Sequence, residues 1–283
     1  MPLKKTVVEI GYEGNHAIRL DTSTRINYPR PAPGDLNAHR PYPQWGEGFG
    51  VEFTSYSHFN ALEISVRQRM THGFSVFSQL TVQHSYGASG YIDPYNFDYG
   101  KGMLASDTGH QFATSLIYAA PAWNGRRWYV KQPFGGWQIS GIYQHRGGLP
   151  FSVSSSQTMN DDINGSRANL TLANGPAALP GSERNFDRWF NTAAFTTPAD
   201  YTWGNSGLNI LRGPGFSELE FALEKSFFVA EGKSLTFRAE ATNALNHVNL
   251  GQPSATLGAA GFGTIRGING DPRIMQMVLK FAF

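Results

Sequence analysis

The chain has 283 residues, no cysteine, a net charge of +2 and only 16% charged residues, whereas aromatic residues make up 13%. This composition excludes disulfide scaffolds, thiol nucleophiles and cysteine–zinc sites, and it gives no reason to expect a nucleic-acid partner. No run of about 18 uncharged apolar residues occurs, so a helical membrane protein is excluded as well.

Eight segments, taken in chain order, have the alternating or β-rich composition of strands. Several of them exceed the roughly 9–11 residues that a tilted strand needs to cross a bilayer. Long and short connections alternate between them, which is typical of outer-membrane barrels with long extracellular loops and short periplasmic turns. The predicted strands cover residues 5–13, 58–70, 73–85, 109–120, 134–147, 215–228, 233–246 and 272–283, and residues 14–57 leave room for a further hairpin.

Apolar and polar residues alternate within these segments, so each predicted strand has one apolar and one polar face. In the second segment, for example, Ile64 and Val66 alternate with Ser65 and Arg67. A soluble sandwich would alternate too, but the loop asymmetry favours a barrel whose apolar face meets lipid. Lys225 falls on an apolar face near a strand end, where we expect its side chain to extend to the membrane–water interface.

Charged residues on the polar faces are expected to point into a water-filled interior, because charges inside a bilayer must face water or one another. The simplest interpretation is a solvated wall of mixed ion pairs; a ligand path or a plug contact is the alternative. Two of the carboxylates share one face, but no nucleophile or pocket accompanies them, so we expect no catalysis and no enzyme activity. The residues are Glu63, Arg67, Arg69, Glu220, Glu224, Arg238 and Glu240.

Aromatic and basic residues gather in the connection that follows residue 120. This mixture suits the aromatic girdle of a barrel at the membrane–water boundary. A surface turn with ordinary aromatic packing is the alternative. The residues are Trp123, Trp128, Tyr129 and Phe134, with Arg126, Arg127 and Lys131 among them.

The last nine residues alternate most regularly, with Gln276 and Lys280 between apolar positions. Soluble sheets rarely end on an uncovered apolar edge, because such an edge invites aggregation. An outer-membrane barrel places its closing strand there, with the apolar face toward lipid. The apolar positions are Met275, Met277, Leu279, Phe281 and Phe283.

The connection 148–214 offers two candidate binding features. Its aromatic residues could stack on a sugar or a peptide, although they equally suit the packing of the loop itself. Residues 160–165 have the spacing of a calcium loop, but Thr171 occupies the position that needs a bidentate Glu, so an ordinary turn explains them better. We therefore expect no metal site and no cofactor. The aromatic residues are Phe186, Trp189, Phe190 and Trp203.

Nine stretches keep a distinctive order and spacing along the chain. They are Val8–His16, Arg40–Pro43, Asp93–Asn96, Gly135–Gly141, Gly148–Phe151, Trp189–Phe195, Asn209–Phe216, Arg238–His247 and Asp271–Arg273. Together they resemble the carboxyl-terminal barrel of TonB-dependent receptors of the Oar type, which are frequent in acidobacteria and usually carry a carboxypeptidase-regulatory-like domain at the amino end.

The resemblance implies a large barrel of about 22 strands around a plug, importing a scarce ligand across the Gram-negative outer membrane with energy from the TonB complex. Residues 1–283 would be the carboxyl-terminal part alone, without plug, TonB-contacting segment or export signal. Its implied partners are outer-membrane lipid, the remaining strands and plug, and the TonB complex only through the missing amino-terminal part. The terminal apolar positions resemble the signal that the barrel-assembly machinery reads.

The sequence thus predicts an all-β fold, an antiparallel transmembrane β-barrel segment of about eight strands. Because an open sheet leaves unpaired backbone groups in hydrocarbon, it must join other strands or close on itself. A self-closed small outer-membrane barrel, acting as an adhesin or structural protein, is one alternative. A soluble carbohydrate-binding β-sandwich, or a glycoside hydrolase on that fold, is the other. Packing of Leu62, Phe221, Leu235 and Leu279 in a sealed interior would contradict the membrane interpretation.

Overall fold

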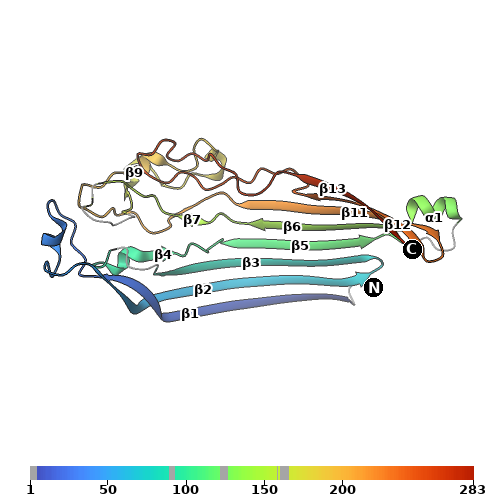
Figure 1. Ribbon diagram of the computed structural model, residues 1–283, viewed down its shortest axis with the longest axis horizontal. Coiled ribbons are helices and arrows are strands. Elements are labelled where there is room, and N and C mark those ends of the chain that lie inside the picture. The colour runs from blue at the N-terminus through green and yellow to red at the C-terminus, as the bar shows by residue number, and fades with distance from the viewer. Residues whose placement is uncertain (1–4, 89–92, 122–126, 158, 160–165) are drawn as a thin grey trace.

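The computed structural model describes residues 5–88, 93–121, 127–157, 159 and 166–283, and one antiparallel sheet runs through its whole length (Figure 1). Eight long strands lie side by side in chain order, β1-β2-β3-β5-β6-β11-β12-β13, and β4 pairs with the end of β3. Their bounds are β1 Thr6–Ile26, β2 Gly48–Thr71, β3 Phe74–Ala88, β4 Lys101–Met103, β5 His110–Ala119, β6 Trp137–Arg146, β11 Phe216–Ala230, β12 Lys233–Thr242 and β13 Ile274–Ala282.

The eight long strands fall on the eight predicted segments, but the predicted number of strands is too low. The described residues form thirteen strands, because short pairs also occur within the connections. The short strands are β7 Pro150–Phe151 with β10 Leu211–Arg212, and β8 Asn169–Leu170 with β9 Phe195–Thr196. One short helix, α1 Trp128–Phe134, and 3-10 turns at Leu36–His39, Phe97–Gly100, Leu172–Asn174, Gly181–Glu183 and Thr192–Ala194 complete the described elements.

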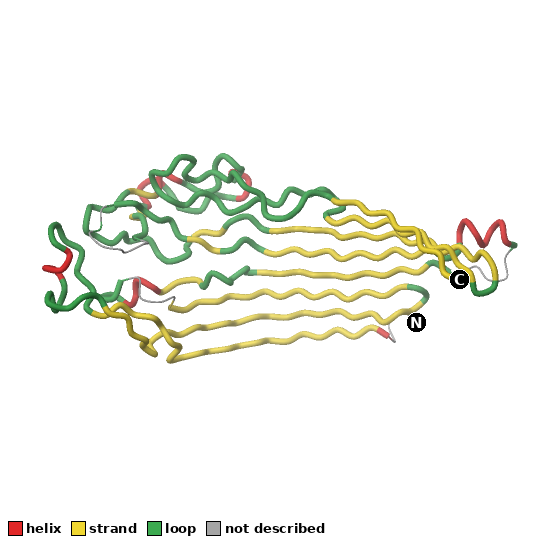
Figure 2. Tube along the Cα trace, viewed as in Figure 1, coloured by secondary structure: helices red, strands yellow, loops and turns green. Residues whose placement is uncertain are grey.

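Long and short connections lie at opposite ends of the sheet (Figure 2). Residues 27–47, 89–109, 147–215 and 243–273 connect strands at one end, called here the long-loop end. The tight turns, α1 and both chain termini lie at the other, the turn end (Figure 1). No additional hairpin occurs in the described residues 14–57, because β1 and β2 continue as a single hairpin until Ile26 pairs with Gly48.

The turn between β2 and β3 shows how local chemistry fixes the strand register. His72 and Gly73 both have positive φ, 52° and 80°, which is the backbone of a type I′ hairpin turn. A Cβ atom on Gly73 would lie 2.0 Å from the carbonyl oxygen of Ala119, so only glycine fits. The turn pairs Thr71 with Phe74, and an irregularity between Gln68 and Thr71 then sets the register of the longer β2–β3 ladder.

The register carries the apolar faces of all the long strands to one side of the sheet. Ile64 lies opposite Ile10 on one neighbouring strand and opposite Leu80 on the other. The side chains of Leu62, Phe221 and Leu279 are 43%, 37% and 66% exposed. The apolar face is therefore an exposed outer surface and not the sealed interior of a sandwich.

A hydrophobic core exists at the long-loop end, within the loops themselves. Its fully buried centre is Phe190, which contacts the rings of Phe151, Phe195 and Phe262 at centroid distances of 5.3–5.7 Å. The other buried members are Val153, Ala168, Ala194 and Leu211. Connection 147–215 is thus a packed structure joined to the last connection through Phe262.

The sheet is open over the residues that the structure describes. β1 and β13 each have a single hydrogen-bonded neighbour, so each presents one free edge. The fold is accordingly a segment of antiparallel sheet and not a closed barrel.

Candidate functional site

The outward, apolar face carries aromatic residues toward both ends and aliphatic residues between them. Opposite residues of paired strands project to the same side, which places all of these residues on one surface. Two aromatic bands around an aliphatic zone are the pattern of a surface that crosses a bilayer. Toward the long-loop end lie Tyr12, Tyr86, Phe112 and Tyr143, and toward the turn end lie Phe74, Tyr118, Trp137 and Phe281.

Polar groups on the apolar face are satisfied within the protein. The hydroxyls of Ser78 and Thr114 lie 2.6 Å apart and bond to each other across the strands. The expectation that Lys225 extends to water is wrong, because the residue is only 2% exposed. Its ammonium donates to the carbonyl oxygen of Gly135 and lies 5.5 Å from the centroid of the Trp137 ring. Aromatic side chains thus cover this charge from outside.

The polar face of β5, β6, β11, β12 and β13 forms a groove of about 400 Å³. The Nε atom of Arg238 donates to Glu240 over 2.8 Å, and its Nη1 lies 3.6 Å from Glu224. Glu220 lines the same groove beside the apolar side chains of Ile117, Ile142 and Ile274. The groove can therefore hold a polar or cationic group against carboxylates while an apolar part contacts isoleucine.

The structure brings together four of the seven charged residues predicted for the interior, namely Glu220, Glu224, Arg238 and Glu240. Glu63 and Arg67 lie apart from them on β2, and the Arg67 guanidinium covers the Phe77 ring at 5.0 Å. Arg69 follows the last regular pair of β2, at the turn end. The isoleucines of the groove occupy positions on the polar face of their strands. In the sequence they could have been recognised as apolar exceptions to the polar alternation on that face.

The terminal strand β13 presents its predicted apolar positions on the outward face. Met275, Met277, Leu279 and Phe281 lie opposite apolar residues of β12 from Ala241 to Leu235. Phe283 is 93% exposed, and its ring lies 5.8 Å from that of Phe281. That these positions act as a barrel-assembly signal stays a prediction. Their side chains are exposed, so a partner could contact them.

Deletion of Phe283 should reduce the amount of folded protein in the outer membrane several-fold. The terminal ring is 93% exposed and stacks on the exposed ring of Phe281, so its loss removes an accessible apolar group and little internal packing. Heat-modifiable protein in membrane fractions measures the effect. The matched variant Lys280→Gln alters the polar face of the same strand and should assemble normally; equal assembly of both variants would contradict the assignment.

Helix α1 places exposed aromatic side chains beyond the turn end of β6. Trp128 is 76% exposed, and Tyr129 and Phe134 are exposed as well. The indole nitrogen of Trp137 donates to the carbonyl oxygen of Pro133 over 2.7 Å, which ties the helix to the sheet. This arrangement agrees with the predicted girdle, although Trp123 and Arg126 lie outside the described residues.

The predicted binding features of connection 148–214 have different outcomes. Phe190 is the core residue described above, Trp189 donates to the carbonyl oxygen of Arg212 over 2.8 Å, and Trp203 packs at 5.2 Å from Tyr99. Three of the four aromatics therefore hold the loop together, and Phe186 alone is exposed. The calcium-like stretch 160–165 lies outside the described residues.

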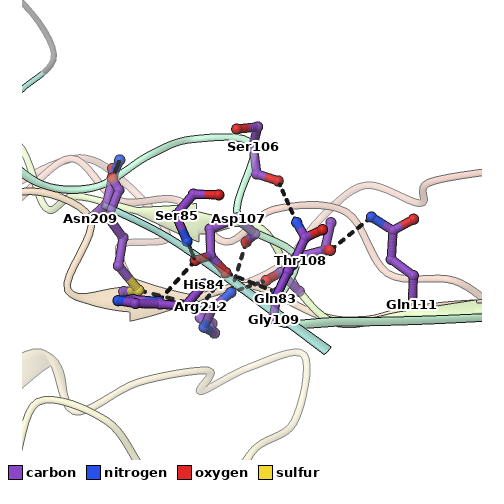
Figure 3. A network of polar contacts seen from close by, with 12 residues as sticks. Gln83, His84, Ser85, Ser106, Asp107, Thr108, Gly109, Gln111, Asn209 and Arg212 are labelled. Carbon is purple, nitrogen blue, oxygen red and sulfur yellow. Dashed lines mark hydrogen bonds and ion pairs between the residues drawn. The ribbon is translucent and has the colours of Figure 1, made fainter. Parts of the chain in front are cut away.

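A buried carboxylate fastens this connection to the sheet (Figure 3). Asp107, whose side chain is fully buried, accepts the backbone N–H of Ser85 over 2.5 Å and that of Gly109 over 2.8 Å. The Nη2 atom of Arg212 donates to it over 2.6 Å, and the Nδ1 atom of His84 lies 3.0 Å away. Arg212 also donates to the carbonyl oxygen of Asp107 over 2.8 Å. We call Asp107 and Arg212 the loop clamp.

Neither member of the loop clamp was predicted from the sequence. Asp107 lies in a Ser-Asp-Thr-Gly run that reads as a turn, and Arg212 lies in the Arg-Gly-Pro-Gly part of a family-like stretch. They are 105 positions apart, and no periodicity connects them. The only sign of the loop clamp in the sequence was that Arg212 lies in the stretch Asn209–Phe216, which resembles the Oar receptors.

Acid should release the loop clamp only at low pH. Burial raises the pKa of Asp107, but the hydrogen bonds from Ser85 and Arg212 outweigh burial and hold that pKa below its ordinary value. A carboxylate whose pKa is lower in the folded protein stabilises the fold at any pH above its pKa in the unfolded chain, about 3.9. This stabilisation is lost as the pH falls through the pKa of the folded state. Tryptophan emission should therefore stay constant from pH 8 to about 5 and change below about 4. A transition at neutral pH that persists in Asp107→Asn would contradict this origin.

Within the described ranges, no group of three or more His, Asp or Glu side chains is placed to hold a metal ion. None of the described helices has the length and apolar character needed to cross a bilayer. The site consists instead of two faces of one sheet and the loops fastened at its end.

Comparison with known proteins gives one family. A family model described as an outer membrane beta barrel domain matches residues 3–276. The match runs from the beginning of β1 to the first residues of β13, so it includes the groove, the loop clamp and the apolar face as far as Met275. The comparison with curated proteins gives no match.

Proposed function

We propose that this chain, which belongs to the outer membrane beta barrel domain family and resides in the outer membrane, is the carboxyl-terminal barrel part of a TonB-dependent receptor of the Oar type. The complete receptor would import a ligand with energy supplied through TonB. This part would form a section of the barrel wall and several outer loops, and would have no enzyme activity.

The open sheet is the observation that carries the proposal. Its outward face is apolar from β1 to β13, and both edges have free backbone groups. Such edges cannot remain in hydrocarbon, because each unpaired N–H or C=O costs several kcal/mol there. Additional strands on each side satisfy both edges, and the motifs that resemble Oar receptors suggest where those strands come from.

Unequal edges favour this proposal over self-closure. β1 has 21 residues, whereas β13 has 9. If the two paired with each other, β13 could cover fewer than half of the residues in β1. A neighbouring strand as long as β1 would satisfy the whole edge, as expected in a larger barrel.

The size of the protein in its native outer membrane tests the proposal. An antibody against residues 166–214 should detect a polypeptide much larger than the 31.1 kDa of this chain. Sequencing the DNA upstream of the Met1 codon should reveal an in-frame plug and export signal. A folded, heat-modifiable 31.1 kDa species, together with a stop codon directly upstream, would instead establish a small self-closed barrel.

A further inference from the structure

Two histidines meet on the outward face near the long-loop end. His110 begins β5 and His145 lies near the end of β6. His145 pairs with Phe112, two residues beyond His110, so the histidines are diagonal neighbours on one face. Diagonal cross-strand neighbours are within reach of each other when their side chains are long or aromatic. His110 is exposed and His145 is half-buried, so the pair is accessible from outside.

The two imidazoles meet tip to tip. Their Nε2 atoms lie 3.2 Å apart, whereas the ring centroids are 5.3 Å apart with an interplanar angle of 25°. The ring centroids are farther apart than the Nε2 atoms by nearly two ring radii. Each ring therefore extends away from the contact between the nitrogens, and the rings do not lie face to face. In this arrangement one hydrogen bond joins the two rings, with an N–H of one ring donating to the ring nitrogen of the other.

A neighbouring strand fixes the orientation of one ring. The Nδ1 atom of His145 lies 2.7 Å from the hydroxyl of Ser217 on β11. The backbone of Ser217 is held in turn by Asn249, which accepts its N–H over 2.8 Å and donates to its C=O over 2.9 Å. If Nδ1 donates to the hydroxyl, the lone pair of Nε2 is directed at His110. An imidazole oriented by such an outer hydrogen bond is typical of metal ligands.

We propose that His110 and His145 form a two-histidine site for a divalent transition-metal ion such as Cu²⁺, Ni²⁺ or Zn²⁺. Two nitrogens bound at 2.0–2.1 Å to one tetrahedral ion lie about 3.3 Å apart, close to the separation found here. A small rotation of each ring, with the proton between them moved to the Nδ1 atom of His110, then lets both Nε2 lone pairs bind the ion. Imidazole nitrogen suits these metals, and water completes the coordination on the exposed side. The ion links β5 and β6, with Ser217 as a positioning residue on β11.

A second histidine pair supplies a matched control. His16 and His58 lie directly opposite each other on β1 and β2, with ring centroids 4.0 Å apart and an interplanar angle of 19°. These rings are stacked face to face. Their lone pairs lie in the ring planes and do not converge on a common point, so this pair provides no chelate.

The experiment measures Cu²⁺ binding to the intact protein, extracted from the outer membrane in detergent and carrying no polyhistidine tag. Calorimetry should detect one saturable site, and electron paramagnetic resonance should resolve coupling to two imidazole nitrogens. Affinity should fall at least tenfold in His110→Gln and in His145→Gln, and about tenfold in Ser217→Ala. The double variant His16→Gln/His58→Gln should bind as the unmodified protein does.

Two results would overturn the site. One is a resonance spectrum of the unmodified protein without two-nitrogen coupling, which needs no variant to fold. The other is unchanged affinity in a His110→Gln/His145→Gln variant whose heat-modifiable migration is normal.

Discussion

Replacing Ile64 with arginine should lower the free energy of unfolding in a bilayer by about 2–4 kcal/mol, the cost of a cation on the lipid face near the midplane. Ile64 lies in the middle of the aliphatic zone, between Ile10 and Leu80 on the neighbouring strands. Among the described neighbours on β1 and β3, no acidic residue faces it. The loss should appear as a lower urea midpoint for the protein in lipid vesicles.

The adjacent variant Ser65→Arg is the control for this prediction. Ser65 projects to the polar face, where its hydroxyl lies 3.3 Å from Glu9 and its cross-strand neighbour on β3 is Gln79. An arginine at this position meets a carboxylate and water, so the urea midpoint should change little. Equal costs at residues 64 and 65, or a larger cost at residue 65, would contradict the assignment of the two faces.

Replacing Asp107 with alanine should lower the free energy of opening connection 147–215 by about 3–5 kcal/mol, the cost of taking a fully buried carboxylate away from three donors. The Arg212 guanidinium and the N–H groups of Ser85 and Gly109 would all lose their acceptor. Exchange of the Gly213 amide, which donates to Leu149, should accelerate by about two to nearly four orders of magnitude.

Asp98→Ala is the matched control in the same segment of the chain. Asp98 pairs with Lys101 at 2.5 Å, but its side chain is 77% exposed. An exposed pair contributes little to stability because water screens it, so Gly213 exchange should stay within tenfold of the original rate. Similar acceleration in both variants would show that the loop clamp holds the connection no better than a surface ion pair.

The long strands could be predicted because their periodicity is local. Twelve-residue segments such as 272–283 contain their own alternation, and the pairing of Ile64 with Ile10 and Leu80 follows once the apolar faces share one side. The two-residue strands β7–β10 could not be predicted, since a two-residue segment has no period. Their pairing depends on the burial of Phe190 among segments far apart in the sequence.

Lys225 and Asp107 show why parts of the site escape such prediction. The burial of Lys225 depends on an aromatic ring from β6 and a carbonyl oxygen beyond it, neither of which is near in sequence. Asp107 requires Arg212, delivered by a connection folded around its own core. Alternation places a residue on a face, but it does not indicate which distant segment will cover that residue.

The packed core of connection 147–215 has a consequence for any molecule that binds at the long-loop end. A chain segment of this length and composition would ordinarily lose much conformational entropy on contacting another molecule. Here Phe190 and its neighbours already hold the backbone around them in one arrangement. A molecule that binds there meets a preformed surface, so less conformational entropy is lost on association. Exposed groups such as Phe186 can then discriminate between arriving molecules by shape, with little rearrangement of the loop on contact.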